Sequence, residues 1–246
     1  MKIDFTNKNI VIIGGTRGIG KSILELFLNC NAHVIATGTK ADDCVSLNKN
    51  IYTNVEYKHL DYTCRKSVNN FLEYLKSIEC IDVLINNAGM NKIDYIENIN
   101  ENDWDLMYNI NLKGPFLITR SVANTMKSVR RGKIINIASI YGVVSRAKRA
   151  AYSASKWGLL GFTKAIALDL SQYNILVNAV SPGFVMTDLT KKILSKDELN
   201  KLITEIPLNR IANVNEIAKT VVFLASDLNT YITGQNIIID GGYTSA

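Results

Sequence analysis

The most constraining feature of the sequence is a glycine-rich turn between a short apolar run and a helical pattern. The run Asn9–Ile13 is almost wholly apolar, as in a strand buried on both faces of a sheet. Gly14-Gly15-Thr16-Arg17-Gly18-Ile19-Gly20 follows directly, and apolar residues then recur with helical spacing over 23–28. Glycines let a backbone approach a pyrophosphate, and the first N–H groups of a helix can bind it. The spacing differs from the general Gly-x-Gly-x-x-Gly, and a turn without a ligand is the alternative interpretation.

Apolar runs alternate with helical patterns along the rest of the chain. Strands are expected at 33–37, 55–60, 81–85, 133–138, 175–180 and 236–239. Helices are expected at 67–78, 151–170 and 214–225, with a long helical region over 102–128 that is interrupted near Gly114 and Pro115. This alternation predicts an α/β fold, a doubly wound Rossmann domain whose parallel sheet has helices on both faces.

No linker or repeat divides the chain, so we expect residues 1–246 to form a single domain. Within it we expect a cofactor half over about 1–135 and a catalytic and substrate half over about 136–246. A polar, lysine-rich stretch over about 187–206, with Leu189, Ile193, Leu199 and Leu202 at helical spacing, is expected to form a lid.

Composition excludes several classes of function. No stretch of about 18 residues is wholly apolar, so no membrane span is expected. The four cysteines are scattered and there are only two histidines, which predicts free thiols in a reducing cytoplasm and no metal site. A net charge of +6 fits a lysine-rich surface or attraction to phosphates. No run interleaves basic and aromatic residues as a nucleic-acid groove would, so we expect no nucleic-acid partner.

A second constellation lies in the C-terminal half. Ser139 ends an apolar run, and Tyr152 and Lys156 lie four residues apart, on one face of the expected helix. A cation beside a phenol favours the phenolate, and a nearby serine could hold a substrate oxygen. Tyr62 and Lys66 have the same spacing and are expected to be an ordinary helix start. The constellation predicts proton transfer to or from a carbonyl.

The end of the second expected strand bears on the choice of cofactor. An acidic residue there would bind the 2′-hydroxyl of an adenosine ribose and repel a 2′-phosphate. None occurs before Asp42 and Asp43, which are expected to open a helix. Side chains that can hold a phosphate are present instead: Arg17, Thr37, Thr39 and Lys40. We therefore expect NADP(H) rather than NAD(H).

These motifs together resemble the short-chain dehydrogenase/reductase family over nearly the whole chain. The resemblance rests on the glycine turn, Asn86-Asn87-Ala88-Gly89, Ser139, Tyr152-x3-Lys156, Pro182-Gly183 and Asp240-Gly241-Gly242. Within the family the chain is most similar to 3-oxoacyl-acyl-carrier-protein reductases, most clearly over 158–164 and 181–188. The resemblance implies a sheet of about seven strands, hydride transfer with a nicotinamide, and usually a homotetramer built partly on the Tyr152 helix.

The resemblance also implies roles for single residues. Tyr152 would exchange a proton with the substrate oxygen, and Ser139 would hydrogen-bond that oxygen. Lys156 would lower the pKa of the tyrosine and hold the nicotinamide ribose, and Asn111 would support a water relay to it. The expected cofactor site comprises Gly14, Thr16, Arg17, Gly18, Ile19, Gly20, Thr37, Gly38, Thr39, Asp61, Tyr62, Asn87, Ala88, Gly89, Tyr152, Lys156, Pro182, Gly183, Val185 and Thr187.

Three positions depart from the family pattern. Ile13 replaces the usual threonine before the first glycine, which predicts the local loss of a hydrogen bond. The loop 145–150 is unusually basic where acyl-carrier-protein reductases are small and uncharged. One of the basic carrier-protein anchors falls on Tyr173, whereas Arg130 and Arg131 are placed for the other.

Three functions follow as hypotheses. The first is NADPH-dependent reduction of 3-oxoacyl thioesters, with the acyl carrier protein as a partner. The second is the same chemistry on another anionic substrate, such as a sugar acid or a nucleotide-linked sugar. Its motive is the basic cluster Arg146, Lys148 and Arg149 near the expected pocket mouth, and a solvated loop is the alternative. The expected substrate residues are Ser139, Arg146 and Arg149. The third is a cofactor-sensing regulatory protein on the same fold.

Overall fold

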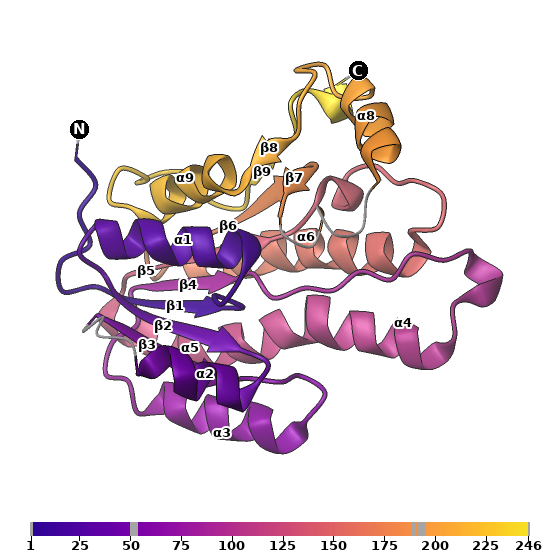
Figure 1. Ribbon diagram of the computed structural model, residues 1–246. Coiled ribbons are helices and arrows are strands. Elements are labelled where there is room, and N and C mark those ends of the chain that lie inside the picture. The colour runs from indigo at the N-terminus through magenta and orange to yellow at the C-terminus, as the bar shows by residue number, and fades with distance from the viewer. Residues whose placement is uncertain (1, 50–53, 188–189, 191–194, 246) are drawn as a thin grey trace.

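The computed structural model describes residues 2–49, 54–187, 190 and 195–245 and has a seven-stranded parallel sheet at its centre (Figure 1). The spatial order is β3-β2-β1-β4-β5-β6-β9, so the chain reverses its direction of winding between β1 and β4. The strands are β1 (Asn9–Ile13), β2 (His33–Gly38), β3 (Val55–His59), β4 (Val83–Asn86), β5 (Gly132–Ile137), β6 (Ile175–Pro182) and β9 (Asn236–Ile239). The predicted α/β fold is confirmed.

Helices cover both faces of this sheet. In Figure 1, α1 and α9 lie on one face, whereas α3, α5 and α6 lie on the other. The helices are α1 (Gly18–Asn29), α2 (Ala41–Asn48), α3 (Arg65–Lys76), α4 (Glu101–Tyr108), α5 (Gly114–Val129), α6 (Ala150–Ser171), α8 (Lys196–Thr204) and α9 (Val214–Ala225). A two-stranded parallel pair, β7 (Val185–Met186) with β8 (Ala212–Asn213), lies outside the main sheet. No helix within the described ranges is long and apolar enough to cross a membrane.

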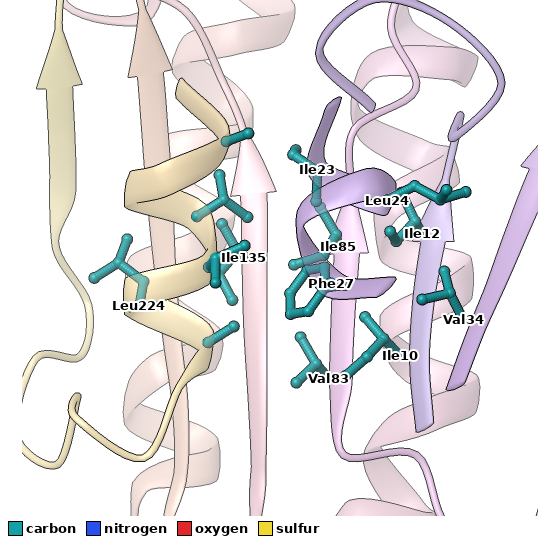
Figure 2. Packing of buried hydrophobic residues seen from close by; sticks show 14 of the residues in the cluster. Ile10, Ile12, Ile23, Leu24, Phe27, Val34, Val83, Ile85, Ile135 and Leu224 are labelled. Atoms are coloured by element: carbon teal, nitrogen blue, oxygen red, sulfur yellow. The ribbon is translucent and has the colours of Figure 1, made fainter. Parts of the chain in front are cut away.

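Alternate side chains of β1 enter two separate cores. Ile10 and Ile12 belong to the core on the side of α1 and α9, together with Phe27 of α1 and Leu224 of α9 (Figure 2). Val11 and Ile13 pack on the opposite side with residues of α3, α5 and α6. A strand buried on both faces must be apolar at successive positions, which explains the continuous run in the sequence.

The interruption of the long helical region is a π-helical segment, and it lies slightly earlier than predicted. α4 ends at Tyr108, residues Asn109–Lys113 form the π-helix, and α5 begins directly at Gly114. Pro115 stands in the first turn of α5, directly after the π-helical segment, and the helix continues through it. Such π segments often mark functional sites, and this one contains Asn111.

Two further boundaries differ from the sequence prediction. β6 extends to Pro182, which pairs with Ile239 of β9, and the N–H of Gly183 donates to the Ile239 carbonyl at 2.8 Å. In the region of the expected lid, α8 starts after a capping box formed by Ser195 and Glu198. Two of the apolar positions that predicted this helix, Leu189 and Ile193, lie outside the described residues.

The packing of Phe27 gives a test of this core. Phe27 is fully buried and makes an edge-on ring contact with Phe5, with ring centroids 4.8 Å apart. Phe27→Ala should lower the free energy of unfolding by about 3–5 kcal/mol, measured by urea denaturation. Val45→Ala is the control, because Val45 is largely exposed on α2 and its loss should change stability by less than about 0.5 kcal/mol. Equal effects of the two changes would contradict this packing.

Candidate active site

The motifs found in the sequence come together at the carboxyl ends of the central strands. Gly14 follows β1, Asn87 follows β4, Ser139 follows β5 and Gly183 follows β6. These strands are neighbours in a parallel sheet, so their carboxyl ends meet at one edge. In open α/β sheets this edge, where the strand order reverses, is where ligands bind.

The glycine turn has the geometry of an anion-binding loop. Gly14 and Gly18 adopt positive φ angles of 80° and 56°, which favour glycine. A Cβ atom on Gly20 would lie 2.0 Å from the carbonyl oxygen of Gly14, so this glycine allows α1 to start close to β1. The Arg17 side chain does not cap α1, which leaves the first N–H groups of the helix free. Asn87 Nδ2 donates to the Gly14 carbonyl at 2.7 Å and ties the turn to the loop after β4.

The substitution of isoleucine before this turn is accommodated by a neighbouring strand. Ile13 is buried in the core, and the N–H of Gly14 donates to Thr37 Oγ1 of β2 at 2.9 Å. The turn is therefore anchored by a side chain from a second strand.

A first cavity, of about 270 Å³, extends from this turn across the ends of β2 and β3. Eleven of the predicted cofactor residues line it: Gly14, Thr16, Arg17, Thr37, Gly38, Thr39, Asp61, Tyr62, Asn87, Ala88 and Gly89. The sequence analysis missed four apolar wall residues: Ile13, Leu60, Met90 and Ile110. No pattern marked Met90 and Ile110, whereas Ile13 ends β1 and Leu60 directly follows β3, so both could have been inferred from that position.

Tyr62 supports the fit of an adenosine group to this cavity. It stands in the turn before α3, and Lys66 lies in the first turn of that helix, as expected for an ordinary helix start. The ring packs on Gly114, where a Cβ atom would lie 2.6 Å from it. The hydroxyl is buried and has no hydrogen-bond partner among the described residues, so it is the ring that forms the cavity wall. Burial raises the pKa of this phenol.

A second cavity, of about 430 Å³, shares Asn87, Gly89 and Met90 with the first. Eight more of the predicted residues line it: Ile19, Ser139, Arg149, Tyr152, Lys156, Pro182, Gly183 and Val185. The two cavities are therefore contiguous, and an elongated dinucleotide could extend from Thr39 to Lys156. Within the described ranges, no group of three acidic, histidine or cysteine side chains could hold a metal ion.

Lys156 and Asn111 are fixed from several directions. Lys156 Nζ is buried and donates to the Ile137 carbonyl at 2.8 Å, and burial lowers its pKa to about 8. Asn111 is fully buried; its Nδ2 donates to the Met90 carbonyl and to Ser155 Oγ, each at 2.9 Å. A Cβ atom on Gly89 would lie 3.4 Å from Asn111 Oδ1 and 3.5 Å from Lys156 Nζ. The absence of a side chain at Gly89 thus keeps the space beside both groups open.

Tyr152 is held in a form suited to donating a proton. Burial raises the pKa of its phenol, whereas the Ser139 hydroxyl and the charge of Arg149 lower it by smaller amounts. Lys156 Nζ lies 5.8 Å from the ring centroid. The expected lowering of the tyrosine pKa by Lys156 is therefore not seen in this arrangement, because burial outweighs the attraction of charges. A phenol that stays protonated at neutral pH can give its proton to an oxygen in the cavity.

Several predicted residues lie outside both cavities. Gly18, Gly20 and Thr187 line neither of them, although a Cβ atom on Gly18 would contact Thr187 at 3.7 Å. Asn111 acts behind the cavity wall through the contacts described above. Arg146 is also absent from the lining: its two terminal nitrogens bind the two carboxylate oxygens of Glu205, each at 3.1 Å. In this structure, therefore, Arg146 pairs with Glu205 and does not line the cavity, and its contact with a substrate stays a prediction.

Arg130 and Arg131 lie at the opposite end of the sheet. They precede Gly132, where β5 begins, whereas Ser139 follows the other end of that strand, roughly 20 Å away along extended chain. Arg130 donates to the Gln172 carbonyl at 2.8 Å, and Arg131 pairs with Asp82 at 3.3 Å. Within one chain, therefore, neither arginine borders the catalytic cavity.

The sequence analysis missed an aromatic wall of the second cavity. Tyr141 makes edge-on ring contacts with Tyr152 and Phe184, with ring centroids 6.3 Å and 6.5 Å apart. Ile93 and Leu202 add apolar surface from the loop before α4 and from α8. Tyr141 stands two residues after Ser139, and this closeness was the only signal that could have identified it.

Comparisons with known proteins agree with this geometry. A family model described as enoyl-(acyl carrier protein) reductase matches residues 14–244. The 3-oxoacyl-[acyl-carrier-protein] reductase FabG of Aquifex aeolicus is 36% identical over 247 residues, covering 98% of this chain and 99% of the relative. FabG of Thermotoga maritima is 38% identical over 239 residues, covering 96% and 97%.

Solved structures are similar over the same length. ElxO with NADP bound has a TM-score of 0.90 at 30% identity, covering 97% of this chain and 99% of that one. A gluconate 5-dehydrogenase from Burkholderia cenocepacia J2315, in complex with NADP and tartrate, has a TM-score of 0.90 at 26% identity, covering 99% and 97%.

Fold and site thus define an oxidoreductase that acts on CH–OH and C=O groups with a nicotinamide cofactor. The chain belongs to the short-chain dehydrogenase/reductase family. This assignment favours an enzyme over a cofactor-sensing regulatory protein.

The pKa of Lys156 predicts the alkaline limb of the pH profile. Below about pH 8 the buried ammonium is charged and can stabilise negative charge on Tyr152; above it the amine is neutral. The value of kcat/KM for NADPH, which reports ionisations of the free enzyme, should therefore fall as pH rises through about 8. The Lys156→Met variant should turn over slowly, and its pH profile should show no inflection near pH 8. A wild-type profile that rises across this range would contradict the assignment.

Proposed function

We propose that the protein is an NADP(H)-dependent reductase whose substrate is a 3-oxoacyl-[acyl-carrier-protein] or a similar 3-oxoacyl thioester. The observation that carries the proposal is the meeting of Ser139, Tyr152 and Lys156 in one cavity that continues into a dinucleotide-sized cleft. The 3-oxoacyl thioester is proposed because the similar curated reductases carry that substrate in their names.

The chain's own residues would perform the proton chemistry. Bound NADPH would supply the hydride to the carbonyl carbon. Ser139 would hold the carbonyl oxygen, and Tyr152 would give it a proton as negative charge develops there. Lys156 would stabilise the resulting phenolate and hold the ribose, and Asn111 would keep the π-helical segment in place behind it. The aromatic wall would exclude water from the reacting atoms.

Two features support NADP(H) over NAD(H). The cavity wall at the end of β2 consists of Gly38 and Thr39, and the first acidic side chains come only within α2. The exposed guanidinium of Arg17 lines the same cavity and could pair with a 2′-phosphate. Two of the similar solved structures carry NADP in their titles.

A second candidate function is the same chemistry on another anionic substrate, such as a sugar acid or a nucleotide-linked sugar. The observation that favours it is the position of Arg149 in the catalytic cavity. The similar gluconate 5-dehydrogenase names a sugar acid as that protein's substrate.

We also propose a cellular compartment and an oligomeric state for the enzyme. The four free cysteines fit the cytoplasm, where thiols stay reduced. Exposed Trp157 and Leu168 on α6 support a homotetramer built partly on that helix. Arg130 and Arg131 could bind an acyl carrier protein only if such an assembly brings them near a neighbouring cavity.

Tyr152→Phe tests the reductase chemistry. NADPH oxidation should be measured with a 3-oxoacyl thioester, an enoyl thioester, a sugar-acid ketone and a neutral ketone. The change should lower kcat by about 100-fold or more while NADPH still binds, because only the proton donor is lost. Turnover of the 3-oxoacyl thioester alone supports the first substrate, and turnover of the sugar acid alone supports the second. Retention of full activity by Tyr152→Phe would contradict the proposal.

Thr39→Asp tests the choice of cofactor. A carboxylate at this position would repel the 2′-phosphate and accept a hydrogen bond from a free 2′-hydroxyl. The KM for NADPH should rise by about 10-fold or more, and the KM for NADH should fall. Ser46→Asp, which adds the same charge on the exposed side of α2, is the control. An unchanged ratio of the two KM values would count against NADP(H).

A further inference from the structure

Arg149 differs from the other basic residues of its loop in facing the catalytic cavity. Arg146 is occupied by Glu205, and the Lys148 ammonium lies 4.4 Å from the centre of the Tyr95 ring. Arg149 is the N-cap residue of α6 and lines the cavity beside Tyr152. The basic cluster in the sequence therefore separates into two residues bound elsewhere and one that borders the reaction.

The guanidinium of Arg149 is held in place without being neutralised. It lies 5.4 Å from the centre of the Tyr141 ring, a contact that orients an arginine but leaves its N–H donors free. Its Nη1 atom is buried and has no hydrogen-bond partner among the described residues. The ion pairs of the described chain do not include this arginine. A buried donor on a charged group is costly to leave unpaired, so a ligand that pairs with it gains affinity.

The cavity as a whole is suited to an anion. Arg149 and Lys156 are its two charged lining residues, and no Asp or Glu lies among the described residues of its wall. Lys156 already donates to the Ile137 carbonyl, whereas the Nη1 donor of Arg149 has no partner among the described residues. The N-terminus of the 22-residue α6 adds positive potential at the same place, since its first turn contains no acidic residue and no side-chain cap.

We propose that Arg149 binds the carboxylate of a short oxo acid or hydroxy acid and thereby selects the substrate. The inference rests on the second candidate function, in which the substrate is an anion and not a thioester, and in which the reacting oxygen lies at Tyr152. Residues three apart at a helix start are roughly 5–6 Å apart, so the carboxylate would lie only a few bonds from the reacting carbon. The planar guanidinium matches a carboxylate with two parallel hydrogen bonds.

Matched substrates test this inference. Acetoacetate and its N-acetylcysteamine thioester share one reacting ketone, but only the first ends in a carboxylate. D-gluconate and D-glucitol form a second pair for the oxidative direction with NADP. Arg149→Met should raise KM for acetoacetate or gluconate by about 10- to 100-fold. KM for the neutral substrate of each pair should change by less than about 3-fold. Arg149→Lys should restore part of the lost affinity for the acids. Arg146→Met should leave the ratio of the two KM values within each pair unchanged.

A binding measurement makes the test independent of turnover. Calorimetric titration of acetoacetate and of gluconate into the NADP complex should show binding to wild type and to Arg146→Met, and weaker binding to Arg149→Met. Melting temperature and NADPH affinity verify that each variant is folded.

Any of three results would overturn the inference. The first is that neither carboxylate binds wild type more tightly than Arg149→Met, and the second is that KM for the neutral substrate rises as much as KM for the acid. The third is an equal fall of kcat for all substrates. If wild type also failed to reduce every carbonyl and Tyr152→Phe made no difference, the proposed function itself would fail. Normal turnover of the thioester with an indifferent Arg149→Met would refute the carboxylate site alone.

Discussion

Burial of the central sheet on both faces is the constraint on which the rest of the structure depends. Strands that are apolar at successive positions can be covered only by helices on each side, and this requires parallel strands joined by right-handed crossovers. The carboxyl ends of β1, β4, β5 and β6 therefore meet at one edge, where the loops do not form the core. Residues far apart in the chain, such as Gly14 and Ser139, become neighbours for this reason.

A buried polar network carries this geometry from the sheet to the catalytic helix. Asn86 Nδ2 donates to Asn136 Oδ1 at 2.8 Å, and Asn136 Nδ2 donates to Thr163 Oγ1 of α6 at 2.8 Å. Asn86 also reaches Thr119 of α5 at 3.2 Å. Directional bonds of this kind, unlike apolar contacts, fix how far a helix slides along the sheet. The position of Tyr152 above Ser139 thus depends on amides in the middle of the core.

The fold and the catalytic residues were predictable because they depend on local patterns. Continuous apolar runs, helical spacing and the Gly14 turn identify the strands, the helices and the cofactor edge, and Tyr152 with Lys156 follows from one helical turn. What the sequence could not show depends on tertiary contacts. Arg146 and Arg149 are chemically alike, yet only the folded chain places Glu205 beside the first. The Tyr141 wall and the upward pKa shift of Tyr152 arise from burial, which sequence spacing does not report.

The pairing of Arg146 with Glu205 bears on how molecules enter and leave the cavity. Glu205 closes α8, whose Leu202 lines the cavity, and Arg146 belongs to the loop that leads into α6. The two segments therefore form one rim. Both side chains are more than a third exposed, and an exposed ion pair contributes at most about 1 kcal/mol. Loss of this ion pair changes the population of an open rim by less than about tenfold, and because salt screens exposed charges, the contribution of the pair falls as ionic strength rises.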